Sequence, residues 1–184
     1  MGNHLAAEYF SLLKSRINFT SVSVLHSKNR YMQIGLQAPD FSLFNSEKQK
    51  VSLHDFKGQN VLLLFFPLAF TSVCTAELCS VRDTLKDYEN LNAVVFGISV
   101  DSVYTLARYK EENHINFTLL SDFNKVVSTT YGTIYETFGF EMKGVSKRSA
   151  FVIDKDGIIK YAEVLENASE VPDFKAINKI LAEL

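Results

Sequence analysis

The sequence contains little cysteine: two of its 184 residues, Cys74 and Cys79. A secreted domain held together by disulfides would use more cysteines and spread them along the chain. A structural zinc site needs four ligands, and the four histidines show no metal-binding spacing with these cysteines. We therefore expect no metal and no cofactor. The cysteine pair is either reactive or incidental, in a reducing compartment such as the cytoplasm.

Long apolar runs and an excess of one charge are also lacking. The longest apolar run, residues 61–66, is too short to cross a bilayer. The 19 basic and 21 acidic residues leave a net charge of −2, which gives no electrostatic reason to expect a nucleic acid or a membrane as partner. Apolar residues make up 47% of the chain, enough for the full hydrophobic core of one domain.

Residues 1–31 differ in composition from the rest. They hold four Lys or Arg, a single acidic residue (Glu8) and many serines, without the continuous apolar stretch of a secretory signal. We predict an N-terminal extension ahead of one domain that spans residues 32–184. A transit peptide for an organelle is the alternative, because such peptides are basic, serine-rich and poor in acids.

From Met32 onward, expected strands alternate with expected helices, which is typical of an α/β domain. The sequence predicts helices over 72–88, 102–113, 124–131 and 174–184, with Asp101-Ser102 as the cap of the second. A turn at Lys155-Asp156-Gly157 predicts a hairpin between the last two strands. The expected strands cover 41–44, 51–53, 61–66, 93–100, 117–120, 150–154 and 158–164.

The stretch from Phe66 to Cys74 carries the clearest chemical signal. A buried strand ends at Pro67, a short loop follows, and Cys74 falls in the first turn of a helix. The unpaired amides at a helix start favour the thiolate, which is the nucleophilic form of cysteine. Thr71 can place its hydroxyl beside the sulfur, to accept a bond from a substrate or donate one to the thiolate. Pro67 adds bulk without an N–H, which limits access of water. The alternative is a buried structural cysteine.

These residues resemble a known family. Pro67-x-x-x-Thr71-x-x-Cys74 is similar to the active-site motif of the peroxiredoxins. The resemblance implies a thioredoxin-like fold with a central mixed β-sheet flanked by helices, and it implies that Cys74 is the peroxidatic cysteine with Pro67 and Thr71 as its loop partners. The stretches that resemble the alkyl hydroperoxide reductase E subgroup are 66–71, 99–102, 119–122 and 147–154, within a likeness that covers 32–184.

The same resemblance implies that Arg148 is the cation beside the sulfur and that Glu77 orients it. Arg148 directly precedes an expected buried strand, and a permanent cation would stabilise both the thiolate and the charge that develops as an O–O bond breaks. Its alternative is a surface arginine next to Lys147. The alternative for Glu77 is an acid favoured by the helix dipole alone.

Cys79 follows Cys74 at a spacing that resembles the peroxiredoxin Q, or bacterioferritin-comigratory, branch. In that branch the second cysteine resolves the sulfenic acid, whereas better-known members of the reductase E subgroup often lack it. The alternative is a small apolar residue that packs on a helix face. The sequence has no third cysteine, which excludes resolution by a distal C-terminal one.

These observations predict a thiol-dependent peroxidase for hydrogen peroxide and organic hydroperoxides. Cys74 would become a sulfenic acid, form a disulfide with Cys79 and be recycled by a thioredoxin- or glutaredoxin-type donor. Two alternatives stay open: a one-cysteine cycle with an external thiol, and a redox sensor or holdase. A thioredoxin-like disulfide reductase is disfavoured because Cys-x-x-Cys is absent. The resemblance also implies a homodimer.

Overall fold

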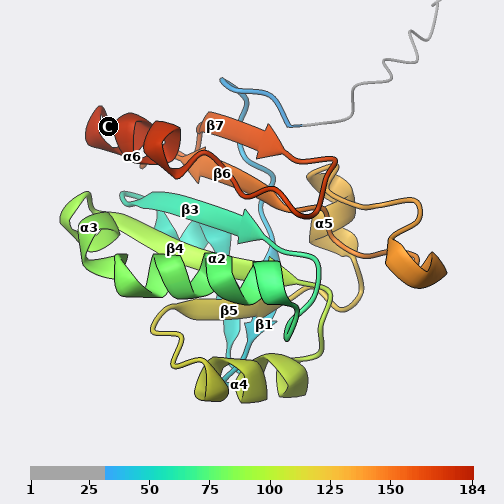
Figure 1. Cartoon of the computed structure of the whole chain (residues 1–184). Helices are drawn as coiled ribbons and strands as arrows, with labels where there is room; N and C mark the ends of the chain where they lie inside the picture. Colours follow the sequence, from blue (N-terminus) through green and yellow to red (C-terminus); the bar gives the residue numbers. More distant parts are fainter. Residues whose placement is uncertain (1–31) are drawn as a thin grey trace, which may run out of the picture.

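The structure, a computed structural model, describes residues 32–184, so the predicted N-terminal extension lies outside the described residues (Figure 1). The described chain forms one mixed seven-stranded sheet in the order β2-β1-β5-β4-β3-β6-β7, and β3, β4 and β5 run parallel to one another. This arrangement confirms the predicted α/β class with a mixed sheet. The strands are β1 (Ser42–Asn45), β2 (Lys50–Ser52), β3 (Asn60–Phe65), β4 (Ala93–Ser99), β5 (Thr118–Ser121), β6 (Ser149–Ile153) and β7 (Ile159–Val164).

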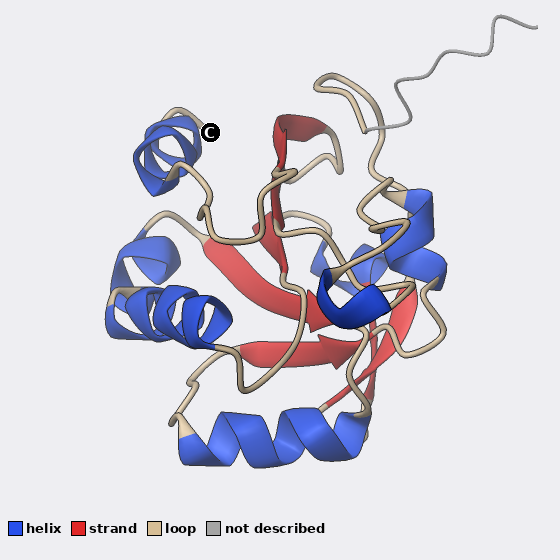
Figure 2. Cartoon of the chain, turned by 45° about the vertical axis from the view of Figure 1, so that its right-hand side comes forward, coloured by secondary structure: helices blue, strands red, loops and turns tan. Residues whose placement is uncertain are grey.

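Helices lie on both sides of this sheet (Figure 2). Side chains of α2, α3, α4 and α6 belong to the core on one face, and α5 contributes to the core on the other. The helices are α2 (Ser72–Asp83), α3 (Leu85–Asn90), α4 (Val103–Glu112), α5 (Val126–Thr130) and α6 (Phe174–Ala182), with short 3₁₀ turns η1 (Leu53–Phe56) and η2 (Gly139–Glu141).

Strand β3 sits at the centre of both cores, because every one of its residues is buried. Side chains alternate between the faces of a strand. Leu62 and Leu64 therefore join the core under α2 and α4, while Leu63 and Phe65 join the core under α5. A strand buried on both faces gives a continuous apolar run, which is the pattern of residues 61–66.

The predicted single helix over 72–88 is wrong in one respect: it breaks at Thr84, which separates α2 from α3. Thr84 has φ −112° and ψ 15°, and its hydroxyl donates to the carbonyl of Ser80 at 3.0 Å. Such a bond from a threonine side chain competes with the regular helix. The helix predicted over 124–131 also begins later, at Val126, because Lys125 has φ 61°.

Two local predictions are confirmed. Ser102 caps α4 and accepts a hydrogen bond from the Thr105 amide at 3.1 Å. The turn between β6 and β7 has φ 86° at Gly157, a conformation that favours glycine, and the Asp154 carboxylate accepts bonds from the amides of Asp156 and Ile158.

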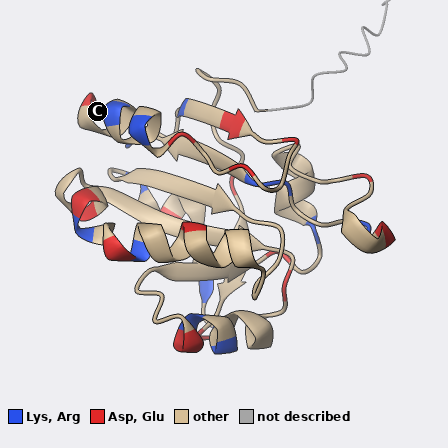
Figure 3. Ribbon diagram, viewed as in Figure 1, with Lys and Arg blue, Asp and Glu red and all other residues tan. Residues whose placement is uncertain are grey.

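Acidic and basic residues lie next to one another along the surface helices (Figure 3). On α4, Arg108 pairs with Glu112 at 2.7 Å, and on α3, Lys86 pairs with Glu89 at 3.4 Å. Within residues 32–184, no helix has the length and apolar character needed to span a membrane.

Candidate active site

The loop between β3 and α2 is held in place from the neighbouring strand. Asp101 follows the end of β4, and its Oδ2 accepts hydrogen bonds from the Ala69 amide at 2.8 Å and the Ser99 hydroxyl at 2.9 Å. Phe70 adopts a left-handed φ of 63° and packs edge-on against Tyr109, with ring centroids 5.1 Å apart. The loop that leads into α2 therefore has a fixed path.

Cys74 lies in the first turn of α2, as the sequence predicts, and Thr71 occupies the N-cap position. Its side chain is 1% exposed. The Thr71 hydroxyl donates to the carbonyl of Leu68 at 2.9 Å, so its hydrogen is engaged and its lone pairs remain for another donor. Pro67 is buried in the loop ahead of Thr71.

Arg148 approaches Cys74 from the adjacent strand. It directly precedes β6, whose first residue, Ser149, pairs with Phe65 at the end of β3. The guanidinium Nη2 lies 3.3 Å from Cys74 Sγ and donates to the carbonyl of Ala168 at 3.0 Å. Arg148 is 1% exposed, so the alternative of a surface arginine is wrong.

Glu77 joins this arginine from the next turn of α2. Its Oε2 accepts a hydrogen bond from Arg148 Nη1, and both side chains are buried. Burial raises the pKa of Glu77 to about 7, although the charge and hydrogen bond of Arg148 act to lower it. Burial acts to lower the pKa of Arg148, but the charges of Glu77 and Cys74 outweigh it and raise that pKa. Within residues 32–184, Glu77 Oε1 and Arg148 Nε find no hydrogen-bond partner.

Cys79 lies on the same helix, half-buried against the core, and both cysteines are free thiols. Residues five apart on an α-helix have Cα atoms about 8.6 Å apart and point about 140° away from each other. A disulfide needs Cα atoms within about 4.4 to 6.8 Å. The folded helix therefore keeps the two sulfurs from bonding.

Three groups at the site were missed by sequence reasoning: the Asp101 carboxylate, the Tyr109 ring and the Ala168 carbonyl. The sequence indicates Asp101 only as part of a helix cap, although this residue belongs to the stretch 99–102 that resembles the subgroup. Tyr109 donates to the Thr75 hydroxyl at 3.2 Å, one residue after the cysteine. The Ala168 carbonyl is a backbone group in a loop, for which the sequence has no signal.

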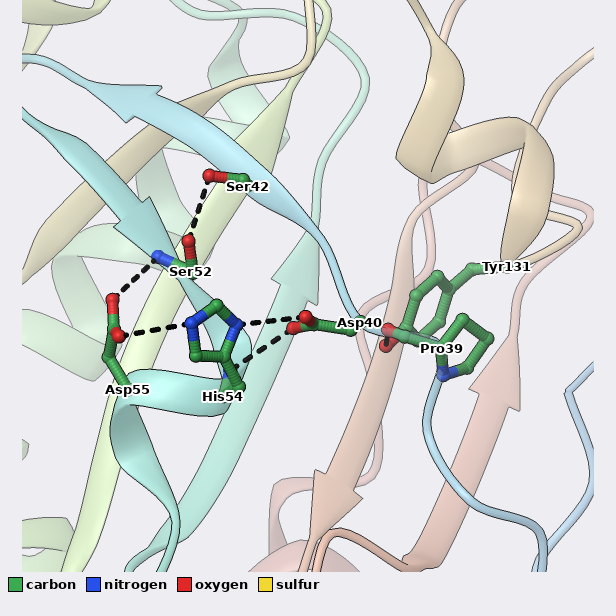
Figure 4. Close-up of polar contacts among 7 residues, drawn as sticks. All are labelled: Pro39, Asp40, Ser42, Ser52, His54, Asp55 and Tyr131. Atoms are coloured by element: carbon green, nitrogen blue, oxygen red, sulfur yellow. Dashed lines mark hydrogen bonds and ion pairs between the residues drawn. The ribbon is translucent and has the colours of Figure 1, made fainter.

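A second polar cluster surrounds η1 (Figure 4). The Asp40 carboxylate lies 2.9 Å from His54 Nδ1 and accepts a bond from the His54 amide, while Asp55 lies 3.4 Å from Nε2. Both ring nitrogens thus face carboxylates, and these contacts connect η1 to the segment before β1. The Ser42 and Ser52 hydroxyls in this cluster hydrogen-bond to each other at 2.8 Å, while the His54 ring is engaged by the two carboxylates. In the described part of the chain, no three His, Cys, Asp or Glu side chains are arranged to hold a metal ion.

Comparisons with known proteins point to one family. The model of the AhpC/TSA family matches residues 34–162. Alkyl hydroperoxide reductase E of Mycobacterium tuberculosis is 38% identical over 156 residues, which cover 83% of this chain and 98% of that protein. The putative peroxiredoxin bcp of Haemophilus influenzae is 39% identical over 130 residues, or 70% of this chain and 83% of that protein.

A solved structure, the reduced 2-Cys peroxiredoxin of Plasmodium vivax, superimposes with a TM-score of 0.71 at 31% identity and covers 82% of this chain and 80% of its own. The sheet, the relatives and the fold together define an enzyme of the peroxiredoxin class of thiol peroxidases. The chain belongs to the AhpC/TSA family.

Proposed function

We propose that the thiolate of Cys74 reduces hydrogen peroxide and organic hydroperoxides. One observation carries the proposal: the Arg148 guanidinium lies 3.3 Å from a buried sulfur at a helix start. The sulfur attacks one peroxide oxygen, the O–O bond breaks, and the other oxygen leaves and takes up a proton as an alcohol or water. Cys74 becomes a sulfenic acid. The cation stabilises the thiolate before the attack and the departing oxygen during it.

The surrounding residues have supporting roles in this proposal. The Thr71 lone pairs accept a hydrogen bond from the peroxide, because the Thr71 hydrogen is engaged by Leu68. Buried Pro67 has no N–H that would compete for the substrate. Glu77 holds one edge of Arg148, so that the other edge faces the sulfur.

We propose further that Cys79 resolves the sulfenic acid and that a thioredoxin- or glutaredoxin-type thiol reduces the resulting disulfide. The free, half-buried state of Cys79 on the same helix supports this role. The competing one-cysteine cycle requires Cys79 to stay packed against the core while an external thiol attacks Cys74. A sensor or holdase would stop after a single oxidation.

We also propose that the protein is a homodimer in the cytoplasm. Phe44, Tyr104 and Phe123 are more than half exposed and border one apolar hollow between β1, the start of α4 and the turn after β5. A second copy of the chain would cover these aromatic rings, whose exposure costs free energy in water. A reducing compartment keeps both cysteines available as thiols.

Two serine substitutions test the roles of the cysteines. Cys74→Ser should abolish peroxide consumption, because the nucleophile is lost. Cys79→Ser should leave the first oxidation fast and should stop disulfide formation, as followed by intact mass after one equivalent of peroxide. Turnover by Cys74→Ser would refute the proposed nucleophile, and normal donor-dependent turnover by Cys79→Ser would favour the one-cysteine cycle.

A further inference from the structure

We infer that Arg82 is a second catalytic arginine, which activates Cys79 for the resolving step as Arg148 activates Cys74 for the peroxidatic step. This inference rests on the proposed role of Cys79 as the resolving cysteine. Arg82 lies three residues after Cys79, so the two side chains share one face of α2. Its Nη1 lies 3.4 Å from Cys79 Sγ.

The guanidinium is fixed by groups from other parts of the fold. Arg82 Nη1 also donates to the carbonyl of Asn113, at the end of α4, over 2.6 Å. The Asn116 side chain donates to the Arg82 carbonyl at 3.1 Å. The end of α4 and the segment after it therefore hold both the backbone and the side chain of Arg82. These contacts fix the position of the guanidinium beside Cys79.

The Asp83 carboxylate also binds Arg82, but it does not lie between the guanidinium and the Cys79 sulfur. Asp83 Oδ1 accepts from Arg82 Nε at 2.8 Å, on a different edge of the guanidinium from Nη1. The Asp83 side chain is 64% exposed, so water screens its charge. The hydrogen bond that Arg82 donates to Asp83 raises the pKa of Arg82, and the charge of Cys79 raises it further against the opposing effect of burial. The Arg82 cation is therefore permanent.

The chemistry of the resolving step needs such a cation. The Cys79 thiolate attacks the sulfur of the Cys74 sulfenic acid, the S–S bond forms, the S–O bond breaks, and hydroxide leaves and takes up a proton to become water. The sulfenic sulfur is reduced and the Cys79 sulfur is oxidised. Only a thiolate attacks at a useful rate, so a charge-assisted hydrogen bond from Arg82 increases the reactive fraction of Cys79.

A purely structural role for Arg82 makes a different prediction. If Arg82 only ties α2 to the segment after α4, then Arg82→Met lowers stability and leaves the pH dependence of Cys79 chemistry unchanged. If Arg82 activates the sulfur, the same substitution slows resolution most at neutral pH. The deficit then shrinks in alkaline buffer, where Cys79 ionises without help.

The test follows the two oxidation steps separately in full-length Arg82→Met, Arg82→Lys and the matched control Arg108→Met, whose arginine pairs with Glu111 and Glu112 on α4. Loss of the Cys74 thiol after one equivalent of hydrogen peroxide reports the first step, and rapid alkylation with intact mass reports the disulfide. We expect Arg82→Met to oxidise Cys74 at the normal rate and to form the disulfide roughly tenfold more slowly at neutral pH. Arg82→Lys should recover part of the rate, and Arg108→Met should match the wild type.

A second measurement avoids peroxide altogether. In a Cys74→Ser background, alkylation of Cys79 by iodoacetamide should be slower with Arg82→Met at neutral pH and should approach the wild-type rate in alkaline buffer. Disulfide formation at an undiminished rate in Arg82→Met, or an alkylation profile that does not move, would overturn the inference and leave the peroxidase proposal intact. Absence of any disulfide in the wild-type protein would overturn the resolving role of Cys79 itself, and this inference with it.

Discussion

At the scale of single residues, the site is built around one buried cation, Arg148, that faces a carboxyl group and a thiol. Arg148 donates to Glu77 through one nitrogen and approaches Cys74 through another. Because the pKa of Glu77 is about 7, this carboxyl gains and loses its proton near neutral pH. When Glu77 is protonated, more of the charge of Arg148 is available to the thiolate. The proton on Glu77 thus adjusts the activation of Cys74 by Arg148 that we propose.

The raised pKa of Glu77 has a consequence for stability. Its folded-state pKa of about 7 exceeds the ordinary value of 4.5, so the folded protein binds the proton more tightly. This stabilisation is complete below pH 4.5 and is lost as the pH rises through about 7, with a loss of at most about 3 kcal/mol. We expect urea unfolding to show a free energy that falls across this window in the wild type and not in Glu77→Gln.

Other carboxylates do not obscure this measurement. The pKa values of Asp40 and Asp154 lie below the ordinary 3.8, because hydrogen bonds from His54 and Lys160 and from backbone amides outweigh burial. Their contributions are lost only in more acidic solution. Equal slopes for the wild type and Glu77→Gln would show that Arg148 keeps Glu77 ionised throughout.

At the scale of elements, helix α2 must open for the proposed disulfide to form. It holds both cysteines in one regular stretch of twelve residues, where their sulfurs face different directions. Its first turn is tied to α4 by the bond from Tyr109 to Thr75, and its last turn by the contacts of Arg82. A disulfide can form only if the first turns of this helix, together with the bond from Tyr109 to Thr75, come apart, while the contacts of Arg82 hold the last turn.

We therefore expect oxidation to lower the protection of α2 against amide hydrogen exchange. Comparison of reduced and singly oxidised protein over residues 71–85 should show a local loss of protection around Cys74 and Cys79, with the mass of the peptide lower by two hydrogens. The β3 amides should stay protected in both forms, because that strand lies at the centre of both cores. A persistent sulfenic acid with Cys79 still alkylatable would contradict the two-cysteine mechanism.

The break between α2 and α3 shows where sequence patterns lose information. Leu78 and Val81 before the break and Tyr88 after it all contribute to the same core, so the helical spacing continues across Thr84. The bond from the Thr84 hydroxyl to the backbone leaves no trace in that spacing. The strands and the starts of α2, α4 and α6 were predictable because apolar runs and caps are local features of the chain.

The site was only partly predictable for a related reason. The setting of Cys74 at a helix start followed from nine consecutive residues. The contact between Cys74 and Arg148 joins positions 74 residues apart, and only the resemblance to a family pointed to it. The Arg82 contact with Cys79 lay within one helical turn and could have been noticed from the spacing alone.

At the scale of the whole molecule, residues 32–184 form a seven-stranded sheet with a core on each face. We propose that this segment is an autonomous domain. Deletion of residues 1–31 should change the melting temperature by less than about 3 °C, which corresponds to about 1 kcal/mol for a chain of this size. Peroxide turnover should also stay near that of the full chain. A large loss of either property would mean that the extension contributes contacts that the domain needs.

The pairing of β3 with β6 also determines where this chain can accept insertions and deletions. Phe65 precedes the loop that leads to Cys74, the proposed nucleophile, and its partner Ser149 follows Arg148. The ladder of backbone hydrogen bonds between the two strands therefore sets the spacing between Cys74 and Arg148. One residue of slippage would displace Arg148 by about 3.4 Å and turn its side chain to the opposite face. Insertions in the surface turns leave that ladder untouched. Related sequences can therefore lengthen their surface loops, whereas a single residue gained or lost inside β6 would move Arg148 away from Cys74 and remove the activation that we propose.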